Sequence, residues 1–96
     1  MSLILIILPR AELEIEKSFH FYNVSRTDLG NNFLKELDYY FDLILQNPRT
    51  FRKNNLGFRE AVIKRFPFLI IYEQLEDYLY IYSVFNTNRN PSTKPK

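Results

Sequence analysis

Six cationic side chains fall within residues 49–65, where Glu60 is the only acidic residue. Cations at this density attract a negatively charged partner, either nucleic acid or an acidic protein segment, and speed its association in a salt-dependent way. A solvated face explains such a run equally well. Residues 1–48 hold 4 basic and 7 acidic side chains, whereas residues 49–96 hold 9 and 4, so the asymmetry extends over the C-terminal half. The six cations are Arg49, Arg52, Lys53, Arg59, Lys64 and Arg65.

A second group with binding chemistry is a run of alternating tyrosines, Tyr78, Tyr80 and Tyr82. Side chains two positions apart on a strand point to the same face, so the three rings are expected to form one aromatic stripe. Such a stripe suits docking of a protein partner, where a few buried aromatics carry most of the affinity. Stacking of single-stranded nucleic-acid bases is the alternative use. We favour the protein partner.

Metal and thiol chemistry are not indicated by this sequence. It contains no cysteine, which excludes disulfides and thiolate ligands, and its one histidine, His20, is predicted on a helix surface one turn after Glu16. The acidic residues Glu12, Glu14 and Glu16 are spaced by two, which places neighbours on different faces of a helix. We therefore predict a solvated acidic helix start, no metal site, no cofactor and no catalytic residue.

Two helices are predicted in the first half of the chain. Pro9 suits a helix start, and Thr27 or Asp28 is predicted to cap the second helix, which ends before Pro48. Apolar residues recur at helical spacing in both. They are Ala11, Ile15, Phe19 and Tyr22 in the first helix, and Leu29, Phe33, Leu37, Tyr40 and Ile44 in the second.

Strands are predicted at residues 4–8, 58–66, 68–73 and 78–86, with residues 49–57 as a loop and residues 74–77 as a tight hairpin connection. If Glu73 lies opposite Tyr78, period two sorts the side chains into two faces. The face expected against the helices holds Ala61, Ile63, Phe68, Ile70, Tyr72, Leu79, Ile81 and Ser83. The outer face holds Glu60, Val62, Lys64, Leu69, Ile71, Glu73, Tyr78, Tyr80 and Tyr82.

The outer face is too apolar and aromatic for contact with water alone, so it is predicted to bind a partner. Arg59 falls on the opposite, core-facing side, where we expect it to pair with a helix carboxylate such as Glu36 or Asp38. The predicted fold is therefore α+β, a helix hairpin packed on one face of a small antiparallel sheet in the order β-α-α-β-β-β. Residues 1–87 form one domain, and residues 88–96 are expected to be a basic, mobile tail.

No membrane association or export is expected, because the apolar run near the N-terminus is too short to span a bilayer and lacks the features of a signal peptide. We therefore expect a cytoplasmic protein.

The element order and three motifs resemble the RelE/ParE toxin superfamily. The motifs are G-x-R, F-P-F-x-I-x-Y and V-F-N-x-x-R-N-P, formed here by Gly57, Arg59, Phe66, Pro67, Phe68, Ile70, Tyr72, Val84, Phe85, Asn86, Arg89, Asn90 and Pro91. The resemblance covers nearly the whole chain. It implies a toxin encoded beside an antitoxin that wraps and neutralises it in a hetero-oligomer.

The superfamily has two main activities, and the residues here favour one of them. RelE-like members cut messenger RNA in the ribosome with cations on the exposed sheet face, but those positions fall on Glu60, Val62 and Leu69. Where some relatives use histidine this chain has Asn86, and no tyrosine or histidine follows Tyr82. The chain looks more like ParE-like members, which bind DNA gyrase instead of breaking a bond themselves.

The resemblance thus implies a gyrase-binding toxin of a plasmid stabilisation system. Two alternatives stay open: a divergent RelE-like ribosome-dependent mRNA endoribonuclease that draws its cations from Lys53, Lys64, Arg65 and Arg89, and an inactive toxin relative. The expected antitoxin-binding residues are Leu69, Ile71, Tyr78, Tyr80 and Tyr82. The expected target-binding residues are Lys64, Arg65, Asn86 and Arg89.

Overall fold

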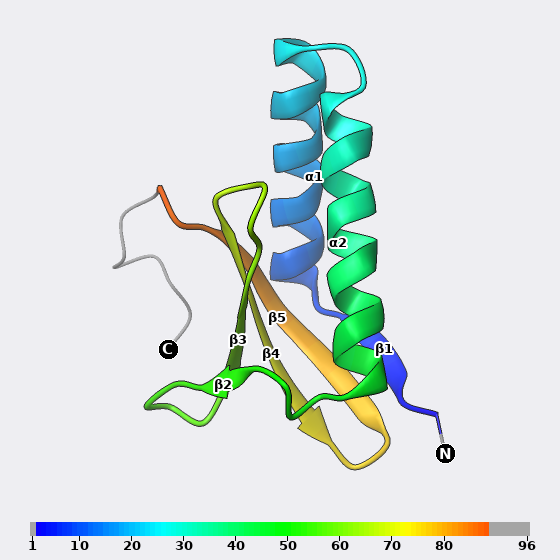
Figure 1. Cartoon of the computed structure of the whole chain (residues 1–96), viewed down its shortest axis with the longest axis vertical. Coiled ribbons are helices and arrows are strands. Elements are labelled where there is room, and N and C mark those ends of the chain that lie inside the picture. Colours follow the sequence, from blue (N-terminus) through cyan, green and yellow to red (C-terminus); the bar gives the residue numbers. More distant parts are fainter. Residues whose placement is uncertain (1, 89–96) are drawn as a thin grey trace.

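A computed structural model describes residues 2–88 of the chain. A helix hairpin packs on one face of a five-stranded sheet with the strand order β1-β5-β4-β3-β2 (Figure 1). The predicted order of helices and strands is confirmed, with one short strand added. The elements are β1 (Ile4–Ile7), α1 (Pro9–Ser25), α2 (Leu29–Gln46), β2 (Arg52–Lys53), β3 (Arg59–Val62), β4 (Phe68–Leu75) and β5 (Tyr78–Asn86).

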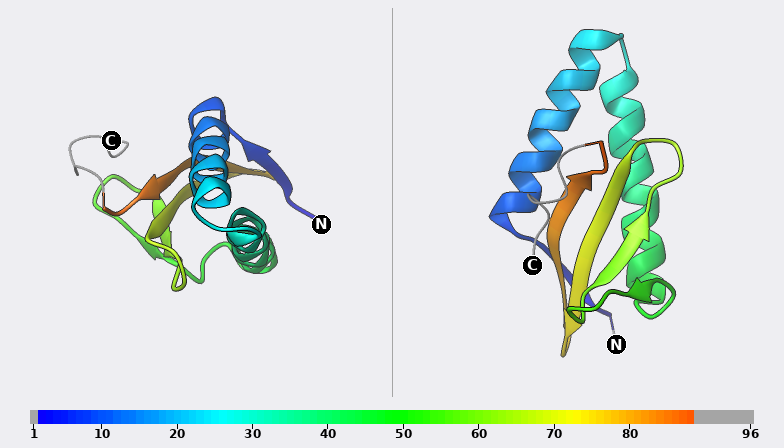
Figure 2. Two further views of the ribbon diagram at one scale, coloured as in Figure 1. Left: turned by 90° about the horizontal axis from the view of Figure 1, so that it is seen from above. Right: turned by 90° about the vertical axis from the view of Figure 1, so that its left-hand side faces the viewer.

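The predicted apolar stripes of both helices face the sheet. In α2, Phe33, Leu37 and Ile44 are almost fully buried, whereas in α1 only Ala11 is, and Ile15 packs at the edge of the core. The hairpin stands along one side of the sheet and leaves the other side uncovered by helices (Figure 2). The core therefore lies between the hairpin and one sheet face.

The turn between the helices differs from the prediction. Neither Thr27 nor Asp28 caps α2 with its side chain, and Asp28 instead adopts a left-handed backbone conformation with φ of 69°. Just after it, Gly30 approaches α1 so closely that a Cβ there would lie 2.9 Å from both the ring and the carbonyl oxygen of Phe19. The absence of a side chain at Gly30 is what lets the two helices meet here.

The sheet is mixed, because β1 runs parallel to β5 while the other strands pair antiparallel. The predicted antiparallel arrangement of the last three strands is confirmed, and the N-terminal strand joins their sheet as expected, in parallel orientation. The segment 49–57, predicted as a loop, contributes the two-residue strand β2, which pairs with β3. The strand expected over residues 58–66 is shorter, since β3 ends at Val62.

The predicted register of the β4–β5 hairpin was also wrong. Leu75 lies opposite Tyr78, so the connection is only Glu76 and Asp77, with Glu76 at φ of 57°. Glu73, expected opposite Tyr78, lies opposite Tyr80. From Leu75 to Tyr72 the shift is two residues, and an even shift leaves the side chains of this part of the hairpin on their predicted faces. The predicted core face is accordingly confirmed, from Ala61 to Ser83.

A bulge in β5 reverses the alternation after Tyr82. Tyr72 pairs with Ile81 and Ile71 pairs with Ser83, which leaves Tyr82 as the extra residue. Unbroken alternation would place Phe85 with Ser83 on the helix side. Instead, Val84 joins the main core and Phe85 lies on the outer face.

Within residues 2–88, neither helix combines the length and the apolar character that crossing a membrane would need.

Candidate functional site

The three tyrosines of β5 line up on the outer face of the sheet. This face of the sheet is turned toward the viewer in the right-hand view of Figure 2. The ring centroids of Tyr78 and Tyr80 lie 6.1 Å apart, and those of Tyr80 and Tyr82 lie 6.5 Å apart. Neighbouring rings are inclined by only 32° and 29°. Tyr78 is the most accessible, at 40% exposure, and the other two are half-buried. The predicted aromatic stripe is therefore present.

Two of the residues expected to bind the antitoxin lie beneath this surface. Leu69 and Ile71 have exposed fractions of 8% and 0%, and with Phe85 they form a second, smaller apolar cluster. Phe58 and Tyr82 pack against it, with their ring centroids 5.0 Å apart. Leu69 and Ile71 thus support the outer face and contribute almost no surface to it.

Tyr82 is held in place by a second contact. Its hydroxyl donates a hydrogen bond of 2.8 Å to Oε1 of Glu73. Burial, helped by the hydrogen bond and negative charge of Glu73, raises the pKa of Tyr82 to about 12. The hydroxyl therefore keeps its proton at neutral pH, and its hydrogen bond to Glu73 holds the ring in place.

The register places two exposed apolar residues beside Tyr78 that the sequence prediction did not single out. Ile4 on β1 and Leu75 on β4 both pair with Tyr78, so all three side chains share the outer face. Their exposed fractions are 51% and 49%. Only the parallel pairing of β1 with β5 could have identified Ile4, because nothing in its local sequence differs from its partly buried neighbours.

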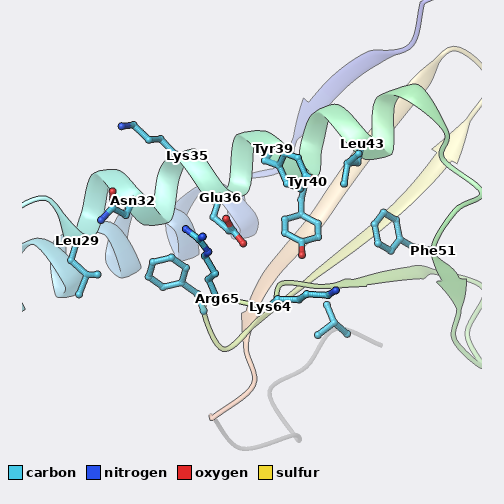
Figure 3. Close-up of a pocket in the computed structure, with 12 residues that line it drawn as sticks. Leu29, Asn32, Lys35, Glu36, Tyr39, Tyr40, Leu43, Phe51, Lys64 and Arg65 are labelled. Atoms are coloured by element: carbon cyan, nitrogen blue, oxygen red, sulfur yellow. The ribbon is translucent and has the colours of Figure 1, made fainter.

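Two of the expected target-binding residues, Lys64 and Arg65, line a groove of about 1080 Å³ beside α2. Figure 3 shows α2 forming one wall and the segment after β3 contributing to the other. Lys35 adds a third cation, and Glu36 is the one acidic residue of the lining. Aromatic rings, those of Tyr39, Tyr40 and Phe51, extend the groove along α2.

Asn86, the third expected target-binding residue, lies at the same end of the sheet but not in this groove. It pairs with Phe68, and the next residue, Thr87, donates its N–H to the carbonyl oxygen of Pro67 over 2.7 Å. The side chain of Asn86 lies beside α1, in a hollow that it shares with Lys17. Arg89, the fourth, lies outside the described residues.

The outer sheet face carries little that could break a phosphodiester bond. The positions where RelE-like ribonucleases hold cations are occupied by Glu60, which accepts a 2.9 Å hydrogen bond from Asn54, by Val62 and by the buried Leu69. His20 lies on the exposed side of α1, edge-on to Phe19. Among residues 2–88 there is also no group of His, Asp or Glu side chains that could hold a metal ion.

Comparisons with known proteins agree with this arrangement. A solved structure entitled "Chromosomal ParDE TA system from P. aeruginosa" superimposes with a TM-score of 0.77 at 12% identity, covering 88% of this chain and 96% of that one, which shows a shared fold. The comparison with curated protein sequences gave no match. A family model described as "ParE toxin of type II toxin-antitoxin system, parDE" matches residues 5–91. The chain therefore belongs to the ParE family of toxins, whose partners in these type II systems are antitoxins.

Proposed function

We propose that this ParE toxin binds and inhibits DNA gyrase, that its cognate antitoxin neutralises it by covering the outer sheet face, and that the pair serves plasmid stabilisation. The proposal rests on the types of side chain that the outer sheet face exposes. It presents a row of three tyrosines beside exposed aliphatic side chains, and the positions where a ribonuclease of this superfamily needs cations hold Glu60, Val62 and Leu69. A surface of this kind binds another protein.

The same observation argues against ribonuclease activity. Attack of a 2′-hydroxyl on its phosphate needs a base for the proton and positive charge for the oxygens of the transition state. Glu60 is negatively charged and Val62 and Leu69 are aliphatic, so these positions stabilise no such charge. Tyr82, which packs against the cluster that contains Leu69, has a raised pKa and so does not supply a base at neutral pH.

Antitoxin docking is best supported at the end of the outer face that contains Tyr78. Tyr78, Ile4 and Leu75 are adjacent across three strands and each is at least 40% exposed. Tyr80 and Tyr82 continue the apolar surface toward the buried Leu69 and Ile71. Burial of such aromatic and aliphatic groups at the centre of an interface supplies most of its affinity.

The target is proposed to meet the cationic end of the sheet. Lys64 and Arg65 are exposed, and with Lys35 they give the groove beside α2 a positive balance. Positive charge at this place speeds encounter with a gyrase–DNA complex, whose DNA is an extended anion. Asn86 lies at the same end of the sheet, and Arg89 follows it in the sequence.

The test is a supercoiling assay with purified gyrase, run beside induced expression of the chain without antitoxin. Inhibited supercoiling, a DNA-damage response and continuing protein synthesis are expected. The double variant Lys64→Ala/Arg65→Ala should inhibit gyrase less. The matched control Arg26→Ala/Arg52→Ala removes the same charge from exposed positions outside the groove and should inhibit as the unaltered chain does.

Two results would contradict the proposal in different ways. An immediate stop in translation with cleaved messenger RNA and unaffected gyrase would establish the ribonuclease alternative. Normal growth with folded toxin accumulating in the cells would instead identify an inactive relative that retains only antitoxin binding.

A further inference from the structure

A small polar hollow lies where β4 extends beyond its neighbour β3. The first residue of β3, Arg59, lies opposite Tyr72, whereas β4 continues to Leu75. The space left beside the end of β4 is a pocket of about 310 Å³. It is lined chiefly by Arg49, Lys53, Gly57, Arg59, Glu73 and Glu76.

The guanidinium of Arg59 is fixed at this pocket by the backbone. Its Nη1 donates a 2.8 Å hydrogen bond to the carbonyl oxygen of Phe51, so the predicted pairing with Glu36 or Asp38 was wrong. The charge of Arg59 also acts on the neighbouring Tyr72, where it opposes the rise in pKa that burial causes. A guanidinium has five N–H donors, so one anchoring bond leaves donors for a further acceptor.

Strand pairing places a second cation directly beside Arg59. Lys53 on β2 lies opposite Arg59 on β3, and paired residues project from the same face of a sheet. Like charges in this position repel one another and destabilise the pair of strands. The other pair of the same two strands, Arg52 opposite Glu60, joins opposite charges. The repulsion is thus confined to the side that faces the pocket.

Nothing in the described part of the chain neutralises these cations by an ion pair. In residues 2–88, no carboxylate lies within ion-pair distance of Arg49, Lys53 or Arg59. Glu73 borders the pocket, but its Oε1 accepts the hydrogen bond of Tyr82 on the outer face. Glu76 lies in the exposed hairpin turn. None of the three cations is ion-paired, and with Glu73 and Glu76 as the two acidic residues of the lining, the pocket keeps a positive balance.

One wall of the pocket has room for a ligand because it lacks a side chain. Gly57 has φ of 89°, in the region that favours glycine, and a Cβ built there would have no atom within 4 Å. A ligand of several atoms can therefore approach the backbone at this point.

From these contacts we propose that the pocket binds a phosphate group through Arg49, Lys53 and Arg59. Arginine forks match the geometry of phosphate oxygens, and lysine adds a mobile point charge. The bound group also relieves the repulsion between Lys53 and Arg59. The phosphate comes either from a nucleic-acid backbone or from a free phosphate compound. The proposal does not depend on gyrase being the target.

The test is a titration of the full chain with inorganic phosphate, followed by amide NMR at constant ionic strength. Saturable shifts are expected at Gly57, Lys53 and Arg59. Lys53→Ala should weaken the apparent affinity about tenfold, the size expected for one charge-assisted hydrogen bond. Arg52→Ala is the matched control, because it removes the same charge one residue away from the pocket lining. The affinity of Arg52→Ala for phosphate should stay within about twofold of that of the unaltered chain.

A competition experiment separates the two sources of phosphate. If inorganic phosphate displaces a labelled single-stranded DNA oligonucleotide, the pocket takes the backbone phosphate of nucleic acid. Saturable phosphate binding without such displacement identifies a free phosphate compound as the ligand. Shifts that never saturate, or an equal loss of affinity in Arg52→Ala and Lys53→Ala, would show mere screening of net charge and overturn the proposal.

Discussion

Glu14 of α1 accepts a hydrogen bond of 2.7 Å from the hydroxyl of Ser83 on β5. The same carboxylate oxygen, Oε1, accepts the backbone N–H of Val84 over 3.1 Å, while Oε2 lies 3.4 Å from Nε of Arg10. Ser83 and Val84 follow the bulge, where the strand departs from regular alternation. Glu14, which the spacing of the acidic residues predicted to be solvated, instead fastens the first helix to the sheet at this point.

Removal of this carboxylate should destabilise the fold. Glu14→Ala leaves the buried hydroxyl of Ser83 and the N–H of Val84 without their acceptor, at a cost of about 1–3 kcal/mol of unfolding free energy. Urea denaturation followed by circular dichroism measures it. Glu12→Ala is the control, an exposed glutamate on the same helix whose loss should cost less than about 0.5 kcal/mol. Equal costs for the two variants would mean that the contact to Ser83 contributes nothing.

Gly30→Ala should also destabilise the protein, although replacing glycine by alanine inside a helix usually stabilises it. Alanine inside a helix is favoured over glycine by about 1 kcal/mol. Here, however, the new Cβ would lie 2.9 Å from the carbonyl oxygen of Phe19, and backbone cannot move aside as a flexible side chain can. The helices must separate, so the midpoint of urea unfolding should fall. Asn31→Ala, at an exposed site in the same turn, should leave it unchanged or raise it.

High pH should unfold the protein through its tyrosines. Burial is the main cause that raises the pKa of Tyr72 and of Tyr82 from 10.0 to about 12. A raised pKa in the folded state means that the stabilisation is complete below pH 10 and is lost as pH rises toward 12. Phenolate absorbance should therefore show a late titrating fraction, and circular dichroism should report unfolding over this range.

Tyr82→Phe is the control for that titration, since it should remove one late-titrating group while leaving that of Tyr72. If every tyrosine ionises near pH 10 in a chain that stays folded, the two hydroxyls are more open to water than the structure shows.

Antitoxin binding should depend on Tyr78 if the proposed docking surface is correct. Tyr78→Ala should weaken binding by about thirtyfold, corresponding to roughly 2 kcal/mol for a central aromatic contact. Tyr39→Ala, also an exposed tyrosine but on α2, should bind as the unaltered chain does. Isothermal calorimetry with the cognate antitoxin measures both. Tyr78 is a cleaner probe than Tyr82, which also supports Phe58 and bonds to Glu73. Unchanged affinity in Tyr78→Ala would place the antitoxin elsewhere.

The sequence by itself determined the two helices, every strand except the two-residue β2, and the two faces of the sheet. These follow from local spacing, 3.6 residues a turn for the stripe that includes Phe33 and Leu37, and two residues for the stripe of Tyr78 and Tyr80. Next to the turn, the face assignments survived the wrong hairpin register because the error there was two residues, and an even shift preserves the direction of the side chains.

Tertiary structure decided what depends on residues far apart in the chain. Parallel pairing put Ile4 beside Tyr78, the bulge turned Phe85 outward, and helix packing brought Glu14 to Ser83. The pairing of β2 with β3 set Lys53 against Arg59. The local spacing of residues does not predict these contacts, because hydrogen bonding between strands and the packing of α1 determine which distant residues meet.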